Sequence, residues 1–190
     1  MKIPVQESKT RPQPPQGTHL ARVLGVVDLG LRPEWVYMGD TKPAQYQVEL
    51  TYELVNTEME PGRPFVTSEM IVNKISKDKE SDKITNLTRR IKAFKGSYDD
   101  PKSWLGQPCM LTLEPKKNKP EYIKIVGQSG VGPVPEGMPV KPLTNDTYFF
   151  DLEDPDMDIF TDFPEWKQEM IKENLEFNGS PLQIALDRLA

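Results

Sequence analysis

Residues 46–54 (YQVELTYEL) alternate between apolar and polar side chains, which is the pattern of a strand with one buried face. This pattern predicts Tyr52 in the core and leaves Tyr46 open between core packing and an exposed position. Gly25 lies midway along a predicted strand over residues 18–29, where it favours a bend or a bulge. Four further segments rich in β-forming residues are predicted strands: 18–29, 65–76, 108–114 and 121–126.

The hydrophobic period changes to that of a helix between the third and fourth predicted strands. We expect one amphipathic helix over about 82–95, with Asp82 as its cap and Gly96 as its stop. Its basic residues Arg89, Arg90 and Lys92 are interpreted as a solvated face. The apolar residues at helical spacing are Ile84, Leu87, Ile91 and Phe94.

The element order of three strands, one helix and two strands is that of the OB-fold, a five-stranded Greek-key barrel. The predicted fold class is therefore mainly β: a five-stranded OB-fold barrel with one helix between strands 3 and 4. An extended acidic C-terminal tail with short helices is expected to follow it.

Composition divides the chain into four predicted regions. Residues 1–17 hold four prolines and are expected to form a flexible N-terminal arm, followed by the OB-fold domain over 18–126. Residues 127–144 are rich in Gly and Pro and are typical of a linker. Residues 145–190 form the acidic tail, with short helices expected from about Pro164 and from Ser180, the cap of the second.

Charge is distributed unevenly along the chain, whose formal net charge is −5. Residues 1–144 hold 21 Lys and Arg against 17 Asp and Glu, whereas residues 145–190 hold 3 against 12. A mildly basic body followed by a strongly acidic end favours an anionic ligand for the body.

Few residues suited to catalysis are present, because His19 is the one histidine and Cys109 the one cysteine. We interpret Cys109 as a buried structural thiol in a reducing cytoplasm. No nucleotide-binding glycine motif occurs, and the acidic run 151–158 lacks the spacing of a calcium loop. The sequence thus predicts a cytoplasmic protein that is not an enzyme and needs no cofactor or metal, and no apolar run suggests a signal peptide or a membrane span.

Basic and aromatic residues gather in the two loops that flank the binding groove of an OB-fold, and on the strands between them. Cations neutralise phosphates and aromatic rings stack on bases, so this pattern predicts a single-stranded nucleic-acid site. The alternatives are a lid or exposed position for Trp35 and core packing for Tyr46. The predicted nucleic-acid-binding residues are Arg22, Arg32, Trp35, Tyr37, Lys42, Tyr46, Lys74, Lys116, Lys117, Lys119 and Tyr122.

The acidic tail intersperses carboxylates with hydrophobic residues, which favours two roles. In the first role the tail competes with DNA for the groove as a tethered anion, and in the second it recruits a partner protein. The alternative to both is a disordered end that only keeps the protein in solution. The residues expected to serve either role are Phe149, Phe150, Asp151, Glu153, Asp154, Asp156, Asp158 and Phe160.

Four segments, GTHLARVLGVVDLG, YQVELTYEL, WLGQPCMLTLE and FFDLEDPDMDIFTDFPEWKQEMIKENLEF, together resemble single-stranded DNA-binding proteins of tailed bacteriophages. The resemblance spans most of residues 17–178. It implies an OB-fold, a role in phage DNA replication or recombination in the host cytoplasm, and an acidic region that recruits replication proteins or masks the groove. The chain departs from many such proteins because it continues past the acidic stretch to SPLQIALDRLA.

We therefore expect sequence-independent binding of single-stranded DNA by the groove, with replication or recombination proteins as possible partners of the tail. The alternative is an OB-fold protein–protein adaptor that acts through the acidic-hydrophobic tail, since fold alone does not decide function. The sequence leaves open the oligomeric state and the preference between DNA and RNA.

Overall fold

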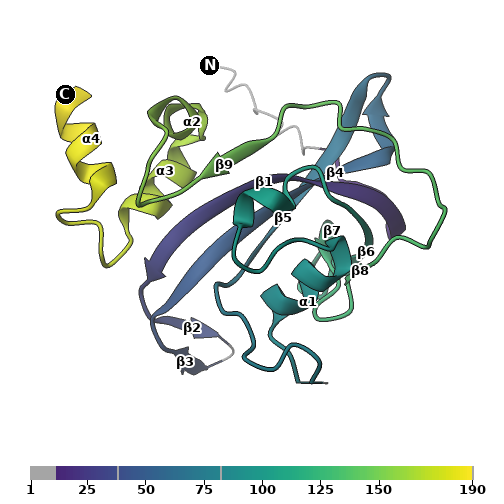
Figure 1. The fold of residues 1–190 in the computed structure, drawn as a ribbon, viewed down its shortest axis with the longest axis horizontal. Helices are drawn as coiled ribbons and strands as arrows, with labels where there is room; N and C mark the ends of the chain where they lie inside the picture. Colours follow the sequence, from purple (N-terminus) through teal and green to yellow (C-terminus); the bar gives the residue numbers. More distant parts are fainter. Residues whose placement is uncertain (1–11, 38, 82, 190) are drawn as a thin grey trace, which may run out of the picture.

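The computed structural model describes residues 12–37, 39–81 and 83–189, without the side chain of Tyr37 (Figure 1). No helix in this part is long and apolar enough to cross a membrane. The strands are β1 (Gly17–Arg32), β2 (Trp35–Tyr37), β3 (Asp40–Lys42), β4 (Gln45–Glu60), β5 (Arg63–Val72), β6 (Pro108–Lys116), β7 (Lys119–Ile125), β8 (Val131–Gly132) and β9 (Tyr148–Phe150). The helices are α1 (Asn86–Phe94), the 3-10 helix η1 (Pro101–Trp104), α2 (Met157–Asp162), α3 (Glu165–Lys172) and α4 (Pro181–Leu189).

The protein is mainly β, and its five long strands form a curved antiparallel sheet in the order β5-β4-β1-β6-β7. These strands are the five that the hydrophobic pattern predicts. The sheet is not a closed barrel, because β5 and β7 do not pair within the described residues. Residues 30–44, which lie between the first two predicted strands and hold no predicted strand, contain a small hairpin in which β2 pairs with β3.

β1 bends where its register against β4 shifts, between Val23 and Gly25 and again between Asp28 and Gly30. The bulge predicted at Gly25 is thus confirmed. The ring of Tyr148 lies directly over this glycine, and a Cβ atom there would be 2.1 Å from the ring. Gly25 therefore bends the strand and makes room for residues 144–189, which we call the C-terminal segment.

The main core lies between the sheet and α1. Tyr52 and Trp104 are buried in it, together with Leu87 and Ile91 of α1. Cys109 is also fully buried, and burial raises the pKa of its thiol to about 12. Both the core position of Tyr52 and the structural role of the cysteine agree with the sequence-based expectation.

α1 begins at Asn86, later than expected, because the side chain of Thr85 accepts a hydrogen bond from the backbone N–H of Thr88 and caps the helix. Asp82, the predicted cap, lies outside the described residues. The solvated face expected for the basic residues is wrong for Arg90, which is 1% exposed. Its guanidinium donates to both carboxylate oxygens of Glu69, at 3.0 and 2.9 Å, so burial leaves the charge paired.

The acidic tail folds against the sheet, which differs from the extended tail predicted from the sequence. β9 pairs in parallel with β1, along the edge that β6 leaves free. Helices α2, α3 and α4 then gather at the end of β1 (Figure 1). The reason is hydrophobic: the tail shares a second buried cluster with β1, formed by Val27, Leu29, Phe150, Leu152, Phe160, Phe163, Ile171 and Leu182.

The segment expected as a linker, 127–144, contains the short strand β8, which pairs with β6. The guanidinium of Arg22 holds the rest of it against β1. Arg22 donates hydrogen bonds to the backbone carbonyls of Lys141 (2.7 Å), Val140 (2.9 Å) and Gly106 (2.7 Å). The path from β8 to β9 is therefore fixed by hydrogen bonds as well as by the elements at its ends.

Replacing Gly25 with alanine is expected to lower the free energy of unfolding by about 1–3 kcal/mol, because the new methyl group overlaps the Tyr148 ring. Urea-induced unfolding measures the change, and Gly132→Ala, whose Cβ meets nothing within 4 Å, is the matched control. In a Tyr148→Ala background the Gly25→Ala effect is expected to shrink. An equal effect in both backgrounds would contradict the overlap.

Candidate nucleic-acid interface

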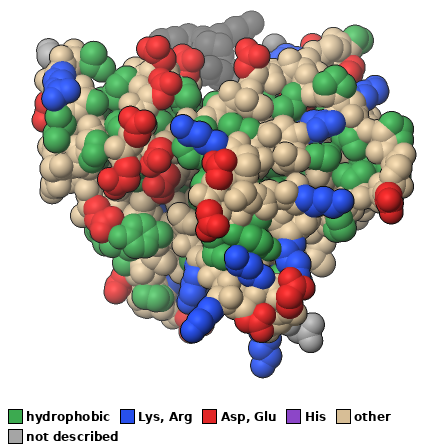
Figure 2. Space-filling view, viewed as in Figure 1, with side chains coloured by type: hydrophobic (Ala, Val, Ile, Leu, Met, Phe, Trp, Pro, Cys, Tyr) green, Lys and Arg blue, Asp and Glu red, His purple; other side chains and the backbone are tan. Residues whose placement is uncertain are grey.

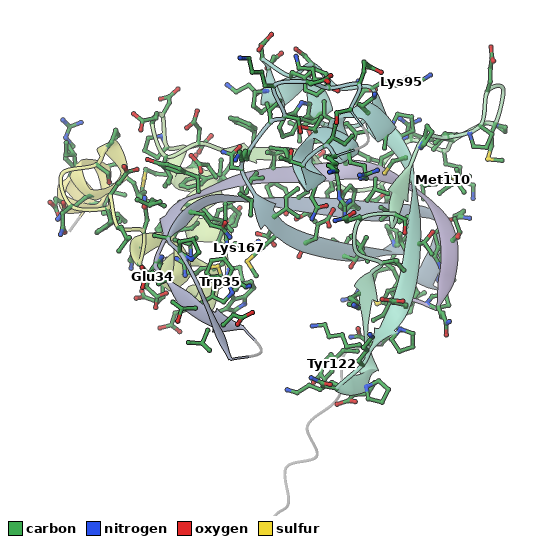
Figure 3. The ribbon with its side chains drawn as sticks, turned by 90° about the horizontal axis from the view of Figure 1, so that it is seen from below. Glu34, Trp35, Lys95, Met110, Tyr122 and Lys167 are labelled. Carbon is green, nitrogen blue, oxygen red and sulfur yellow. The ribbon has the colours of Figure 1, made fainter. Side chains whose placement is uncertain are left out.

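Two hairpins project to the same side of the arched sheet, as Figure 3 shows. One is the β2–β3 hairpin, which carries Trp35, and the other is the β6–β7 hairpin, which carries Tyr122. Most of the nucleic-acid contacts predicted from the sequence belong to these two hairpins. The fold thus brings both groups to one side of the molecule.

A pocket of about 360 Å³ opens beside the first hairpin. Arg32 and Trp35 line it, with Gln47 of β4, Met70 of β5 and Met170 of α3. Met70 is 54% exposed, although methionine is apolar, and it extends the hydrophobic surface next to the half-buried indole of Trp35. An aromatic ring beside an exposed apolar side chain is a surface on which a planar base can stack.

The second hairpin carries the densest group of cations on the sheet's strands. Lys116, Lys117 and Lys119 are all exposed at its tip. Tyr122 is 39% exposed, and the Lys116 ammonium lies 5.9 Å from the centre of its ring. This tip therefore offers positive charge and an aromatic face together, which are the two groups that a single strand requires.

The outward faces of β4 and β5, at the other end of the sheet order from β6 and β7, differ in accessibility. On β5, Ser68 and Met70 are exposed. On β4, Glu49, Thr51 and Glu53 are buried, although their alternation predicts a polar, solvated face. The C-terminal segment covers this part of β4.

Each of these three buried polar side chains has a partner in the C-terminal segment. The Glu53 carboxylate accepts hydrogen bonds from the backbone N–H groups of residues 144 and 145, at 2.6 and 3.0 Å. The Tyr148 hydroxyl donates to Thr51 at 2.8 Å, and the Lys167 ammonium pairs with Glu49 at 2.7 Å. Because the buried polar groups of β4 all find partners in this segment, and Lys167 is itself buried, the segment is an integral part of this face of the protein.

The same segment engages two of the predicted nucleic-acid contacts. The guanidinium of Arg32 donates to the backbone carbonyl of Met170 and, at 3.1 Å, to the carboxylate of Glu173. The Tyr46 hydroxyl donates to the carboxylate of Glu176 at 2.8 Å. Tyr46 is otherwise exposed, so its alternative as a core residue is wrong.

The remaining predicted contacts are Arg22, Lys42, Lys74 and Tyr37, of which Lys42 and Tyr37 belong to the β2–β3 hairpin. Arg22 donates hydrogen bonds to the three backbone carbonyls described above. It was predicted to contact nucleic acid in the groove, but in the structure its role is structural. Lys42 pairs with Asp40 at 3.6 Å across a largely exposed surface. Lys74 is exposed just beyond the end of β5, and the side chain of Tyr37 lies outside the described part of the chain.

The aromatic residues of the tail that were expected to contact a partner protein pack against other parts of this chain instead. Phe150 and Phe160 are fully buried with their ring centres 5.8 Å apart, and Phe149 packs against the main core. Asp156 caps α2 by accepting hydrogen bonds from the backbone of Asp158 and Ile159. The carboxylates remain on the surface, where Figure 2 shows acidic side chains gathered over the C-terminal end. Those exposed among the predicted tail residues are Glu153, Asp154, Asp156 and Asp158.

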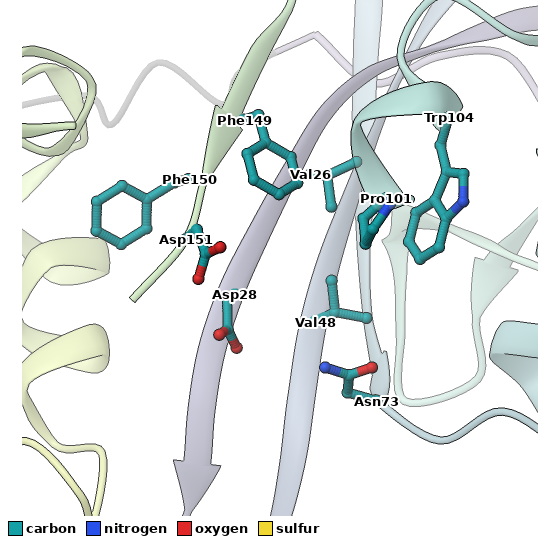
Figure 4. Close-up of a pocket in the computed structure, with 9 residues that line it drawn as sticks. All are labelled: Val26, Asp28, Val48, Asn73, Pro101, Trp104, Phe149, Phe150 and Asp151. Atoms are coloured by element: carbon teal, nitrogen blue, oxygen red, sulfur yellow. The ribbon is translucent and has the colours of Figure 1, made fainter. Parts of the chain in front are cut away.

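A small hollow of about 110 Å³ lies where β9 meets the sheet (Figure 4). Trp104 and Phe149 line its apolar side, and the carboxyl groups of Asp28 and Asp151 line its other side. Burial, together with the negative charges of Asp151 and Glu153, raises the pKa of Asp28, although its hydrogen bond from the Gly30 N–H works in the opposite direction. An acidic hollow repels phosphate, so it lies outside the candidate interface.

Sequence reasoning missed the contribution of the tail to this surface, namely Lys167, Met170, Glu173 and Glu176. One feature of the sequence pointed to Lys167: it is one of only three basic residues in the acidic region 145–190, so a specific partner for it was to be expected. No group of three or more metal-ligating side chains that could hold an ion occurs among the residues that the structure places.

Comparisons with models of protein families, with curated proteins and with solved structures find no match to this chain. The assignment of the interface therefore rests on the geometry and chemistry described above.

Asp28→Asn is expected to stabilise the protein at neutral pH. A carboxyl group whose pKa is raised by folding binds its proton more tightly in the folded state, so its contribution to stability is present at low pH. That contribution is lost as the pH rises from the unfolded value of about 3.8 through the raised folded value. Urea unfolding between pH 3.5 and 7.5 is expected to show a gain for the variant that vanishes at the acidic end. A constant difference at every pH would exclude this cause.

Proposed function

We propose that the chain binds single-stranded DNA without reading its sequence, on the side of the sheet to which both hairpins project. One observation supports this most directly. The two hairpins set Trp35 and the lysine-rich tip with Tyr122 on the same side of the sheet, together with the exposed outward face of β5. Cations beside aromatic and apolar surfaces are the groups that such binding requires.

The strand order supports an OB-fold for this proposal. In an OB-fold, strands one to five form a partly open Greek-key barrel, with ligands on the face of strands two and three and in the loops that flank it. Here β1, β4, β5, β6 and β7 take those places in chain order, and α1 lies between the third and fourth. The two hairpins correspond to the two flanking loops.

Binding would combine stacking with neutralisation of phosphate charge. Trp35 and Tyr122 would stack on bases, and the lysines of the β6–β7 hairpin would neutralise phosphates, over roughly 4–16 nucleotides. Since every base has a flat face, stacking tolerates any sequence. Neutralisation releases counterions, so affinity is expected to fall as salt rises.

The C-terminal segment would lower this affinity through its own contacts with the interface. Arg32 and Tyr46 already have carboxylate partners in Glu173 and Glu176, and a strand would have to replace these contacts. A role in phage DNA replication or recombination, in the host cytoplasm, rests on the resemblance of the sequence to phage single-stranded DNA-binding proteins.

A protein–protein adaptor is the second candidate, and two exposed side chains of the C-terminal segment favour it. Trp166 is 58% exposed and Leu175 is 56% exposed. Large apolar side chains on the surface are common anchors of protein interfaces. In that case the tail would bind a partner with these residues, because Phe150 and Phe160 are buried.

Trp35→Ala is expected to weaken binding of a labelled oligo-dT at least fivefold, since stacking on one base contributes about 1–3 kcal/mol. Lys116→Ala/Lys117→Ala is expected to weaken it too, and to reduce the slope of log affinity against log salt by about 1.4, or 0.7 for each lost phosphate contact. Fluorescence anisotropy at several salt concentrations measures both effects.

Lys77→Ala/Lys141→Ala is the control, because it removes two exposed lysines that lie outside both hairpins. Its affinity is expected to fall much less. Unchanged binding in the Trp35 and Lys116/Lys117 variants would refute this interface. No binding of oligo-dT by the native chain at low salt would favour the adaptor.

Glu173→Gln/Glu176→Gln is expected to tighten oligo-dT binding several-fold at low salt, because it removes the carboxylates that hold Arg32 and Tyr46. Glu165→Gln/Glu169→Gln makes the same change of net charge on α3, away from those two residues. An equal gain in both variants would reduce the effect to net charge alone and would contradict competition at the interface.

A further inference from the structure

A further pocket, of about 530 Å³, opens between α1 and the segment that follows β7. Arg89 and Lys92 line it, one turn apart on α1, and Ser129 and Val131 line it from the other segment. Lys95, which caps α1, lies on the opposite side of the arched sheet from Trp35 and Tyr122 (Figure 3). The pocket is therefore separate from the proposed DNA interface.

The side chain of Arg89 has no partner of its own in this pocket. Within the described residues it makes no hydrogen bond or ion pair, and its Nε atom is buried without an acceptor. This contrasts with Arg90, the next residue, whose guanidinium is bound to Glu69 and to two carbonyl groups. Arg89 as a whole is half-buried, so its guanidinium lies at the pocket with its donors uncommitted and can bind an acceptor there.

The neighbours of Arg89 add further donors. The Lys92 ammonium lies on the same face of the helix, where it bonds to the Lys79 carbonyl and, at 3.0 Å, to Glu80. The hydroxyl groups of Ser81 and Ser129 also line the pocket. The carboxylate of Glu80 lines the pocket as well and pairs with Lys92, so within the described residues the guanidinium of Arg89 is the unpaired cation there. A guanidinium binds a phosphoryl group with two parallel hydrogen bonds, and the hydroxyl groups can donate to a remaining oxygen.

The pocket is also larger than a phosphate group and has an apolar wall. Ile84 and Val131 provide apolar surface beside the cations. Its volume falls in the range of small-molecule sites, so the space beyond the phosphoryl group suits a sugar and a base.

We propose that this pocket binds the phosphoryl group of a nucleotide through Arg89, with Lys92 as the second cation. The phosphoryl group belongs either to a free mononucleotide or to the backbone of a nucleic-acid strand. The site stands apart from the hairpin interface and does not depend on it.

Isothermal titration calorimetry of the full chain with dTMP and with inorganic phosphate tests the proposal. Arg89→Ala is expected to weaken dTMP binding at least tenfold, and Arg89→Lys less, because it keeps the charge and loses the paired hydrogen bonds. Lys77→Ala removes an exposed lysine outside the pocket and is expected to bind dTMP like the native chain. Thermal unfolding without ligand is expected to be nearly unchanged by Arg89→Ala, because the side chain has no partner to lose.

Anisotropy of oligo-dT with the same variants separates the two sources. Weakening of dTMP binding alone identifies a free nucleotide, and weakening of oligo-dT binding alone identifies a strand. Equal affinities of the native chain and both Arg89 variants for dTMP and for oligo-dT would overturn the proposal. If Trp35→Ala still weakened oligo-dT binding in that case, the hairpin interface would stand while this site failed.

Discussion

The buried guanidinium of Arg90 joins parts of the sheet that no backbone pairing connects. In the part of the chain that the structure describes, β5 and β7 do not pair, yet Arg90 reaches from α1 to the Glu69 carboxylate on β5 and to the carbonyls of Gly127 and Gln128 after β7. The Tyr52 hydroxyl donates to the same carboxylate at 2.9 Å. Burial, with the nearby Glu69 charge, raises the pKa of Tyr52 well above its usual value, so it stays a donor. The Arg90–Glu69 pair thus connects helix α1 with β4, with β5 and with the segment after β7.

A different set of polar contacts holds the C-terminal segment on the outward face of β4. Glu49, Thr51 and Glu53 form a row along the strand, and each is buried against a partner from that segment. Beside them the hydrophobic cluster around Val27 and Leu29 supplies the larger apolar area. The accessible part of the proposed interface is therefore shifted toward β5 and the two hairpins. Any ligand on this side must share the surface with the chain's own carboxylates.

The local patterns predict the strands well because a period of two depends only on neighbouring residues, whereas long-range partners are absent from such patterns. The helical pattern places Arg90 in solvent because its partner Glu69, 21 residues away, comes close only when α1 packs against β5. The docking of the tail had one indication, the apolar pair Val26 and Val27, which points to burial on both faces of β1. In the candidate site, the lysine-rich hairpin followed from composition, but the contacts of Arg32 and Tyr46 with the tail required the fold.

The parallel pairing of Gly25–Val27 with Tyr148–Phe150 also bears on how the chain folds during synthesis. One edge of β1 stays without this partner until residues 148–150 have left the ribosome, although β4, on the other edge, is available early. During that interval the nascent protein exposes unpaired backbone groups next to Val27 and Leu29, a combination that invites association with other chains. Termination of translation before residue 148 would leave this edge permanently open, so β9 protects β1 against aggregation.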